Sequence, residues 1–340
     1  MRREQFSVNQ LLVNSINGFP FPGGIGMGKA HYVVPASSST SKYRDWLVAN
    51  GVNPSDIYAT VTAGEDATTA YRNDVVFVFP GAYDEAAEIA WDKPQTHLIG
   101  CGGPNSLGDF SEANVVIYSD TITVASIITV TGQNCIFENF TVSNYGNNAA
   151  CLTAFTLNKY GCYFKNVTFQ GNMTTNQNTT VAAASLYIGT DGMYPIFEDC
   201  VIGQDCWGTR SGANSGQLRF TGTGQPNGGQ FKRCRIVSIS DVVTCAAVAL
   251  PANGAIGRGW VWDNCVFQNL SPAGAAWANC NNVFYDNDAA GQTLLLKDCV
   301  GMGYAEWQAG GASADRRIFS NMGVATAGGG LTIEPTATIS

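Results

Sequence analysis

A short phrase of six residues occurs six times between residues 137 and 301, and this repeat constrains the fold more than any other feature. The copies are FENFTV at 137, FKNVTF at 164, FEDCVI at 197, FKRCRI at 231, WDNCVF at 262 and LKDCVG at 296. Their first residues are 27, 33, 34, 31 and 34 positions apart. A period of this size is typical of repeats that stack on their neighbours to build one continuous core.

The order of apolar and polar residues inside the phrase predicts a bend in the chain. Positions one, four and six are mostly apolar, whereas position two is charged in every copy. A continuous strand points positions one and four to opposite faces, so both can be buried only if the chain turns at position three. Asn and Asp readily adopt the left-handed backbone of such a corner. They predominate in this column, which is Asn139, Asn166, Asp199, Arg233, Asn264 and Asp298. We therefore expect an all-β chain folded as a parallel β-helix, with a differently shaped corner at Arg233.

The charged second position suggests how the coils are held in register. The column alternates in sign along the chain: Glu138, Lys165, Glu198, Lys232, Asp263 and Lys297. Opposite charges on neighbouring strands stabilise their pairing, and like charges oppose it. We expect these side chains to point to solvent and each coil to lie in register on the last.

Composition narrows the function classes. The chain has 340 residues, 39 glycines and only 13% charged residues, where soluble proteins carry roughly a quarter. The net charge of −8 argues against a nucleic-acid partner, which needs a basic face. No apolar run approaches the roughly 18 residues of a membrane helix. The first residues also lack the apolar segment of a secretory signal.

The cysteines are expected to be reduced core residues. Four of the eleven form column four of the phrase: Cys200, Cys234, Cys265 and Cys299. Without a secretory signal, buried thiols are more plausible than disulfides. The only histidines are His31 and His97 and no CxxC pair is present, so we expect neither a metal site nor a cofactor.

The remaining sequence suggests four segments. Residues 1–30 form an arm, 31–95 a cap with short helices and the first strands, 96–308 the parallel β-helix and 309–340 an extended tail. Helices are predicted at 41–51 and, more weakly, at 64–74. Cap helices cover the raw strand edges that a β-helix exposes at its end.

The strand and rung order over residues 60–305 resembles the pectin-lyase-like right-handed parallel β-helix proteins. The stretches GKAHYVV, PGAYDE and WDKPQTHLIG also resemble β-helix proteins of tailed-bacteriophage virions. This second resemblance implies a non-enzymatic protein that decorates or cements the capsid on the virion surface, after assembly in the bacterial cytoplasm. It further implies a homotrimer partnered by the major capsid protein, with Arg2, Arg3 and Phe6 as possible anchors to the coat.

The alternatives are a carbohydrate-active β-helix, such as a tailspike depolymerase or a pectate-lyase-like enzyme, and a non-catalytic receptor-binding spike. Pectate lyases need acidic residues that converge on calcium and an arginine base. The one grouping that suggests this is Asp199, Asp205 and Arg210, with Trp207 beside it for sugar stacking. Glycoside hydrolysis needs two carboxylates at a fixed separation, and no such pair is evident.

Two further motifs are weighed and set aside. GGIGMGKA at 23–30 has the spacing of a phosphate loop, but Ala30 stands where Ser or Thr must hold magnesium. GAYDE resembles the opening motif of pectin methylesterases through Gly81, Tyr83 and Glu85. The other signatures of that family are out of order or absent, so the motif is interpreted as a turn.

Overall fold

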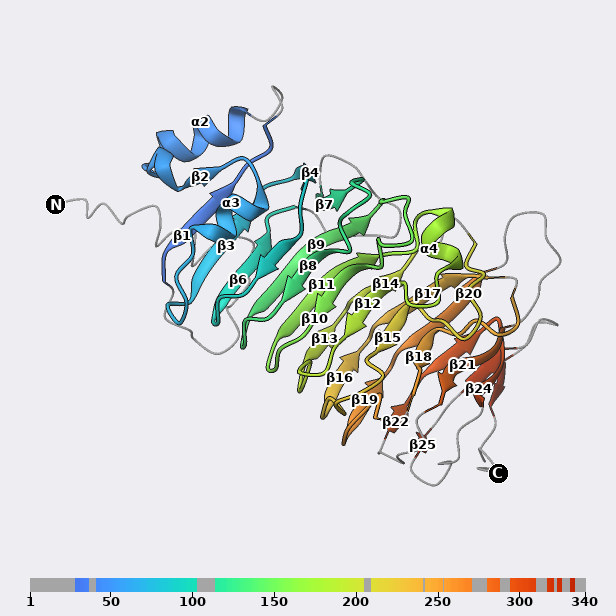
Figure 1. The fold of residues 1–340 in the computed structure, drawn as a ribbon. Helices are drawn as coiled ribbons and strands as arrows, with labels where there is room; N and C mark the ends of the chain where they lie inside the picture. Colours follow the sequence, from blue (N-terminus) through green and yellow to red (C-terminus); the bar gives the residue numbers. More distant parts are fainter. Residues whose placement is uncertain are drawn as a thin grey trace.

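A computed structural model describes residues 28–36, 41–102, 114–204, 209–240, 242–252, 254–270, 280–287, 294–309, 317–320, 323–325 and 331–333. These residues form a right-handed parallel β-helix, whose coils stack along one axis from β1 at the blue end to β24 at the red end (Figure 1). The predicted fold class is confirmed. No described helix is long and apolar enough to span a membrane.

Each coil contributes strands to two sheets, and the larger sheet, of 19 described strands, is folded at the predicted corner. The strands that precede the corner are β1 (Ala30–Val33), β3 (Asp74–Val78), β6 (Thr96–Gly100), the first halves of β9 (Ile136–Asn144) and β11 (Tyr163–Gln170), β13 (Ile196–Glu198), β16 (Gly229–Lys232), β19 (Trp260–Asp263), β22 (Leu294–Lys297) and β25 (Arg317–Ser320). The strands that follow it are β4 (Gly81–Asp84), β7 (Val115–Ser119), the second halves of β9 and β11, β14 (Val201–Gly203), β17 (Arg235–Ile239), β20 (Val266–Leu270), β23 (Val300–Met302) and β26 (Gly323–Ala325).

The other sheet has eight described strands and forms the remaining wall of each coil. They are β5 (Ile89–Trp91), β8 (Ser126–Val130), β10 (Thr153–Leu157), β12 (Ala184–Ile188), β15 (Leu218–Phe220), β18 (Val248–Leu250), β21 (Cys280–Asp286) and β24 (Tyr304–Ala309). Short β2 (Ile57–Tyr58) pairs with β1, and β27 (Leu331–Ile333) pairs antiparallel to β26. A short helix, α4 (Thr175–Thr179), lies in the connection after β11.

The corner has the left-handed backbone that the repeat predicts. Every residue of the column has a positive φ, between 51° and 62°. Arg233, at 52°, has the same backbone as its neighbours, so the expectation of a differently shaped corner there is wrong. Asn139 Nδ2 donates to Gly100 O at 2.9 Å, and Asn166 Nδ2 donates to Asn139 Oδ1 at 2.6 Å. The amides therefore link neighbouring coils as well as favouring the turn.

Replacing Asn166 with alanine should destabilise the fold by about 1–2 kcal/mol, because alanine pays the full cost of the left-handed backbone at φ 51° and loses the amide bond. Asn166→Gly removes the same bond but fits the backbone, so it should cost less than the alanine variant. Urea unfolding followed by tryptophan fluorescence measures both. An alanine variant no less stable than the glycine variant would contradict this account of the corner.

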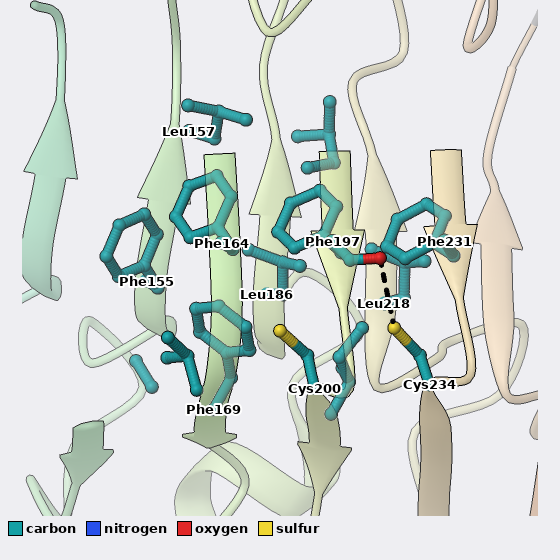
Figure 2. Close-up of a cluster of buried hydrophobic side chains, with 14 of the residues drawn as sticks. Phe155, Leu157, Phe164, Phe169, Leu186, Phe197, Cys200, Leu218, Phe231 and Cys234 are labelled. Atoms are coloured by element: carbon teal, nitrogen blue, oxygen red, sulfur yellow. Dashed lines mark hydrogen bonds between the residues drawn. The ribbon is translucent and has the colours of Figure 1, made fainter. Parts of the chain in front are cut away.

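The core is built from columns of identical or similar side chains. Position one of the phrase is fully buried in all six copies: Phe137, Phe164, Phe197, Phe231, Trp262 and Leu296. The rings of Phe164, Phe197 and Phe231 stack nearly parallel, with centroids 4.4 and 4.6 Å apart (Figure 2). In-register stacking of parallel strands places like residues one strand spacing apart, which suits offset ring stacking.

The cysteine column is buried and free of disulfides, as predicted. Each thiol after the first donates to the carbonyl of the aromatic residue one coil earlier. The pairs are Cys234 with Phe197 O at 3.5 Å (dashed in Figure 2), Cys265 with Phe231 O at 3.3 Å and Cys299 with Trp262 O at 3.5 Å. A small apolar side chain with a weak donor therefore fits the inner side of the corner.

The charge column stacks in register, but its ion pairs differ from the expectation. Each member of the column pairs with the next across the strands. Lys297 Nζ lies 3.1 Å from Asp263, as alternation predicts, whereas Glu198 pairs with the corner residue Arg233. Glu138 is only 6% exposed, so its predicted place on the solvent side is wrong. Burial raises the pKa of Glu138.

Two helices cover the N-terminal coils, as predicted (Figure 1). Helix α2 (Ser41–Ala49) confirms the predicted helix at 41–51, and its Leu47 packs on the outer face of β1 and β3. A 3-10 turn, η2 (Pro54–Asp56), follows. Helix α3 (Val61–Asp66) begins and ends earlier than the predicted 64–74, because Thr60 caps its first turn. Gly64 of α3 lets the helix approach Val33 and Val76 closely.

Candidate functional site

A groove of about 600 Å³ lies on the outer face of the eight-stranded sheet. It crosses several coils between β5 and β18, and it is lined by outward side chains together with Phe220 of the core. The lining residues are Glu88, Ala125, Ser126, Thr129, Leu152, Thr153, Thr156, Ala182, Tyr187, Arg219, Phe220, Gly222, Pro251 and Ala252.

Strand alternation explains which residues reach the groove. On each strand the penultimate residue points outward, while its two neighbours are buried in the core. Register aligns these penultimate residues into one column, in which Ala249 is fully buried: Thr129, Thr156, Tyr187, Arg219, Ala249 and Tyr285. The column therefore changes along the axis from hydroxyl groups to a tyrosine and then to a cation.

Arg219 is the cation of the groove. It is half-buried, and its Nη1 donates to Val181 O at 3.2 Å. Burial lowers the pKa of Arg219, while the phenols of Tyr187 and Tyr285 act in the opposite direction. A guanidinium keeps its charge at neutral pH despite such a shift. Ala249, which follows it in the column, is fully buried. Arg219 itself lines the groove and keeps part of its surface exposed there.

The other half of the groove combines hydroxyl groups with apolar side chains and carries no charge until its end. Thr153 Oγ1 and Thr156 Oγ1 lie 3.0 Å apart, and Ser126 Oγ donates to Ile128 O. Glu88 is the one carboxylate among the lining residues, and it precedes β5. β5 and β15 are four strand spacings apart in the sheet, about 19 Å, so Glu88 does not meet Arg219.

Among the described residues, the groove has neither a pair of catalytic carboxylates nor a cluster of metal ligands. Its single carboxylate leaves no pair at the separation that two-carboxylate glycosidases use. No group of three or more His, Cys, Asp or Glu side chains among the described residues is arranged to hold a metal ion. The chemistry on offer is a cation, a phenol and a row of hydroxyls on a rigid sheet.

The two described members of the grouping considered from the sequence, Asp199 and Arg210, do not come together. Asp205 and Trp207 lie outside the described residues, as do the possible anchors Arg2, Arg3 and Phe6. Asp199 is a corner residue, and its carboxylate lies 2.8 Å from Arg233 Nε. It is on the corner between β13 and β14, away from the eight-stranded sheet.

Arg210 is a buried structural residue. Its Nε donates to Ser215 Oγ at 2.7 Å, Nη2 donates to Ala183 O at 2.6 Å and Nη1 donates to Asn172 Oδ1. Burial lowers the pKa of Arg210 to about 10. The guanidinium ties together two connections, from β11 to β12 and from β14 to β15, and it is fully enclosed. It is not available to a substrate.

The described residues of the other two motifs, at 28–30 and 81–85, have structural roles. The Glu85 carboxylate accepts from Val61 N at 2.6 Å and from Thr62 Oγ1 at 2.7 Å, so it caps α3. Tyr83 is buried and donates to Phe79 O at 2.6 Å. Lys29, from the loop that resembles a phosphate loop, lies 2.5 Å from Asp56, and strand β1 follows it.

The groove residues were missed at the level of sequence. The signal that was available is alternation: SLYIG and QLRFT each place one polar or amphipathic residue between two apolar ones. That pattern identifies Tyr187 and Arg219 as outward residues. It does not say that they lie on neighbouring coils, because the connections between them vary in length.

Comparison with known proteins supports the fold. No protein-family model and no curated protein matches the chain. Among solved structures, the pectin methylesterase of Erwinia chrysanthemi has a TM-score of 0.52 at 15% identity, covering 84% of this chain and 82% of its own. The Aspergillus niger pectin methylesterase has 0.53 at 13%, covering 89% and 88%. Pectate lyase Pel9A has 0.55 at 17%, covering 82% of this chain and 64% of its own.

These neighbours correct two expectations. They are named as pectin methylesterases and a pectate lyase, which contradicts the interpretation as a non-enzymatic capsid decoration or cement protein and the expectation that the chain is not an enzyme. GKAHYVV, PGAYDE and WDKPQTHLIG, which suggested phage proteins, form β1, β4 with the α3 cap, and β5 to β6. Any capped β-helix needs such elements. The chain has the pectin-lyase-like right-handed parallel β-helix fold.

Proposed function

We propose that this protein is a carbohydrate-active β-helix that binds a carboxylate-bearing polysaccharide along the groove of the eight-stranded sheet and acts on it. The observation that carries the proposal is Arg219, a half-buried cation that follows a tyrosine and a row of hydroxyls in one outward column. Hydroxyl groups and an aromatic ring suit a pyranose chain, and a guanidinium suits a carboxylate. Several of its structural neighbours are named for pectin or pectate.

Among reactions on such a chain, the groove favours β-elimination over hydrolysis. In elimination the C5–H bond breaks and its proton passes to a base, a C4=C5 double bond forms, and the C4–O bond breaks with the leaving oxygen taking a proton from water. A cation at the uronate carboxylate acidifies that C–H, and the phenol of Tyr187, next to Arg219 in the column, is the lining group that can accept the proton as a phenolate. Hydrolysis by paired carboxylates needs a second acid near the first, and Glu88 is the one carboxylate that lines the groove. The expected products are oligosaccharides with an unsaturated uronate at the new non-reducing end.

Calorimetric titration with polygalacturonate tests the binding. Arg219→Gln should weaken it about 10- to 100-fold, the effect of one hydrogen-bonded charge pair. Arg219→Lys, which keeps the charge but loses the fork of donors, should fall between the variant and the wild type. The matched control is Arg235→Gln, because Arg235 is an exposed arginine on β17 that bonds Gln268 and lies on another face. Its removal should leave the affinity unchanged.

The ultraviolet absorbance of unsaturated uronates follows the reaction in the same samples. Two results would contradict the proposal. One is equal binding of polygalacturonate and an uncharged galactan, since the argument depends on the carboxylate. The other is an Arg219→Gln variant that binds polygalacturonate as tightly as the wild type does.

A further inference from the structure

A second column of residues with left-handed backbone conformation runs along the β-helix. It lies in the turns that lead into the strands before the corner. Strand register aligns seven residues at this place on successive coils, all with φ between 45° and 74°. They are Asn73, Gln95, Asn134, Gly161, Tyr194, Gly228 and Gly259. Asn and Gly are the residues that this backbone favours.

Tyr194 is the one bulky aromatic residue in this column. A left-handed backbone is unusual for such a side chain, and strain of this kind is retained where it serves a function. Its ring is 61% exposed, so the core gains little from it. The backbone is nevertheless held firmly, because Tyr194 N donates to Asn227 O at 2.9 Å and to Gly228 O at 2.7 Å.

The ring of Tyr194 rests on the next coil. A Cβ on Gly228 would lie 3.0 Å from the ring, so the absence of a side chain at this glycine lets the ring pack against the backbone. On the preceding coil Tyr160 is 40% exposed, and register places it beside Met193, one residue before Tyr194. Lys159 Nζ lies 5.9 Å from the centroid of the Tyr160 ring. Two exposed tyrosines and a cation therefore lie on adjacent turns.

These turns continue directly from the groove. Tyr187 in the groove and Tyr194 belong to the same coil, seven residues apart. On the next coil Gly222 lines the groove, and the same connection leads to Gly228 beneath the Tyr194 ring. Thr190 Oγ1 donates to Thr223 O at 3.3 Å and joins the two turns between these points. A chain that leaves the groove on this side meets the tyrosines next.

We propose that Tyr194, with Tyr160, is a stacking platform for pyranose rings of the polysaccharide that extends beyond the groove. This inference rests on the proposed function, because it assigns the same ligand to a second contact surface. The ring faces supply apolar area, and Lys159 supplies a charge for a uronate carboxylate. The platform lengthens the footprint on the polymer and favours long chains over short ones.

The decisive variant is Tyr194→Asn, which restores the residue type that two other coils carry at this corner. It should bind polygalacturonate about 5- to 10-fold more weakly, the loss expected for one aromatic stack. Its resistance to urea should equal or exceed that of the wild type, since strain is removed. Tyr194→Phe should keep the wild-type affinity. Tyr71→Asn is the matched control, with φ 61° and 64% exposure but a place on the β3 coil, four coils away.

The outcomes separate this inference from the proposed function. If Arg219→Gln weakens binding but Tyr194→Asn does not, the platform is refuted and the groove stands. An equal loss in Tyr71→Asn also refutes it, because the effect would then not depend on place. A wild type that binds no polygalacturonate overturns both proposals together.

Discussion

Replacing Phe197 with alanine is expected to reduce the free energy of unfolding by about 3–5 kcal/mol, the range for a large aromatic residue removed from a packed core. Phe197 is fully buried between Phe164 and Phe231, with ring centroids 4.4 and 4.6 Å away, and Phe169 meets its edge (Figure 2). The stack is fixed by strand register, so the neighbouring rings cannot close the cavity without breaking the ladder on both sides. Urea unfolding followed by tryptophan fluorescence gives the loss.

Two comparisons show whether the loss comes from the stack. Phe197→Leu keeps most of the volume and should cost clearly less than the alanine variant. Tyr71→Ala removes an aromatic ring that is 64% exposed and should change stability by less than about 0.5 kcal/mol. A loss below about 1 kcal/mol in Phe197→Ala would refute the view that this column carries the stability of the central coils.

The stability of the N-terminal cap is expected to depend on the ionisation of Glu65. This side chain of α3 is 3% exposed and lies 3.2 Å from Lys93 Nζ, while its Oε1 has no partner among the described residues. Burial outweighs the lysine and raises the pKa of Glu65 to about 7. Between about pH 4.5 and 7 the folded state therefore holds a proton that the unfolded state has released. The stability from this proton is present at low pH and is lost as pH rises toward 7, by about 3 kcal/mol in all.

Glu65→Gln removes this titration while keeping the shape of the side chain. The variant should gain about 3 kcal/mol relative to the wild type between pH 4.5 and pH 8, measured by urea unfolding at both values. His97, whose pKa burial lowers to about 4, opposes the trend in both proteins and cancels in the difference. Asp66→Asn, at an exposed neighbour on the same helix, is the control: it removes only the smallest contribution to the raised pKa of Glu65, so its change with pH should be much smaller. A difference between Glu65→Gln and wild type that is independent of pH would contradict the assignment.

The corner illustrates how far the sequence reaches. Position three predicts a left-handed turn because the apolar residues on either side of it demand a bend, and all six turns have that backbone. Arg233 was expected to differ, yet it adopts the same φ, because stacking on Asp199 and Asn264 imposes the shape whatever the residue type. Glu138 was expected at the surface, yet it is buried. Local patterns thus predict the backbone conformation of a residue better than its burial, because burial depends on distant segments that cover it.

The candidate site shows the opposite limit. Arg219 and Tyr187 are 32 residues apart, and their strands carry no repeat as regular as the phrase before the corner. Only the paired register of β12 and β15 brings them to one surface. Arg210 was grouped with Asp199 and Asp205 as a possible base of the alternative enzyme, whereas the fold encloses it with Asn172 and Ser215. Proximity in the sequence does not tell whether a loop side chain points into the protein or to solvent.

By itself, the sequence determined the β-helix, its left-handed corners, the stacked aromatic and cysteine columns and the register of the charged column. Each of these features follows from a repeating pattern. Equivalent positions of successive coils have the same surroundings, so the pattern of one repeat predicts the contacts of all. The tertiary structure alone decided which outward side chains share a groove, which arginine is exposed and where Tyr194 lies. These features depend on which strands of neighbouring coils pair and in which register. The connections between those strands differ in length, so a local sequence pattern does not predict the pairing.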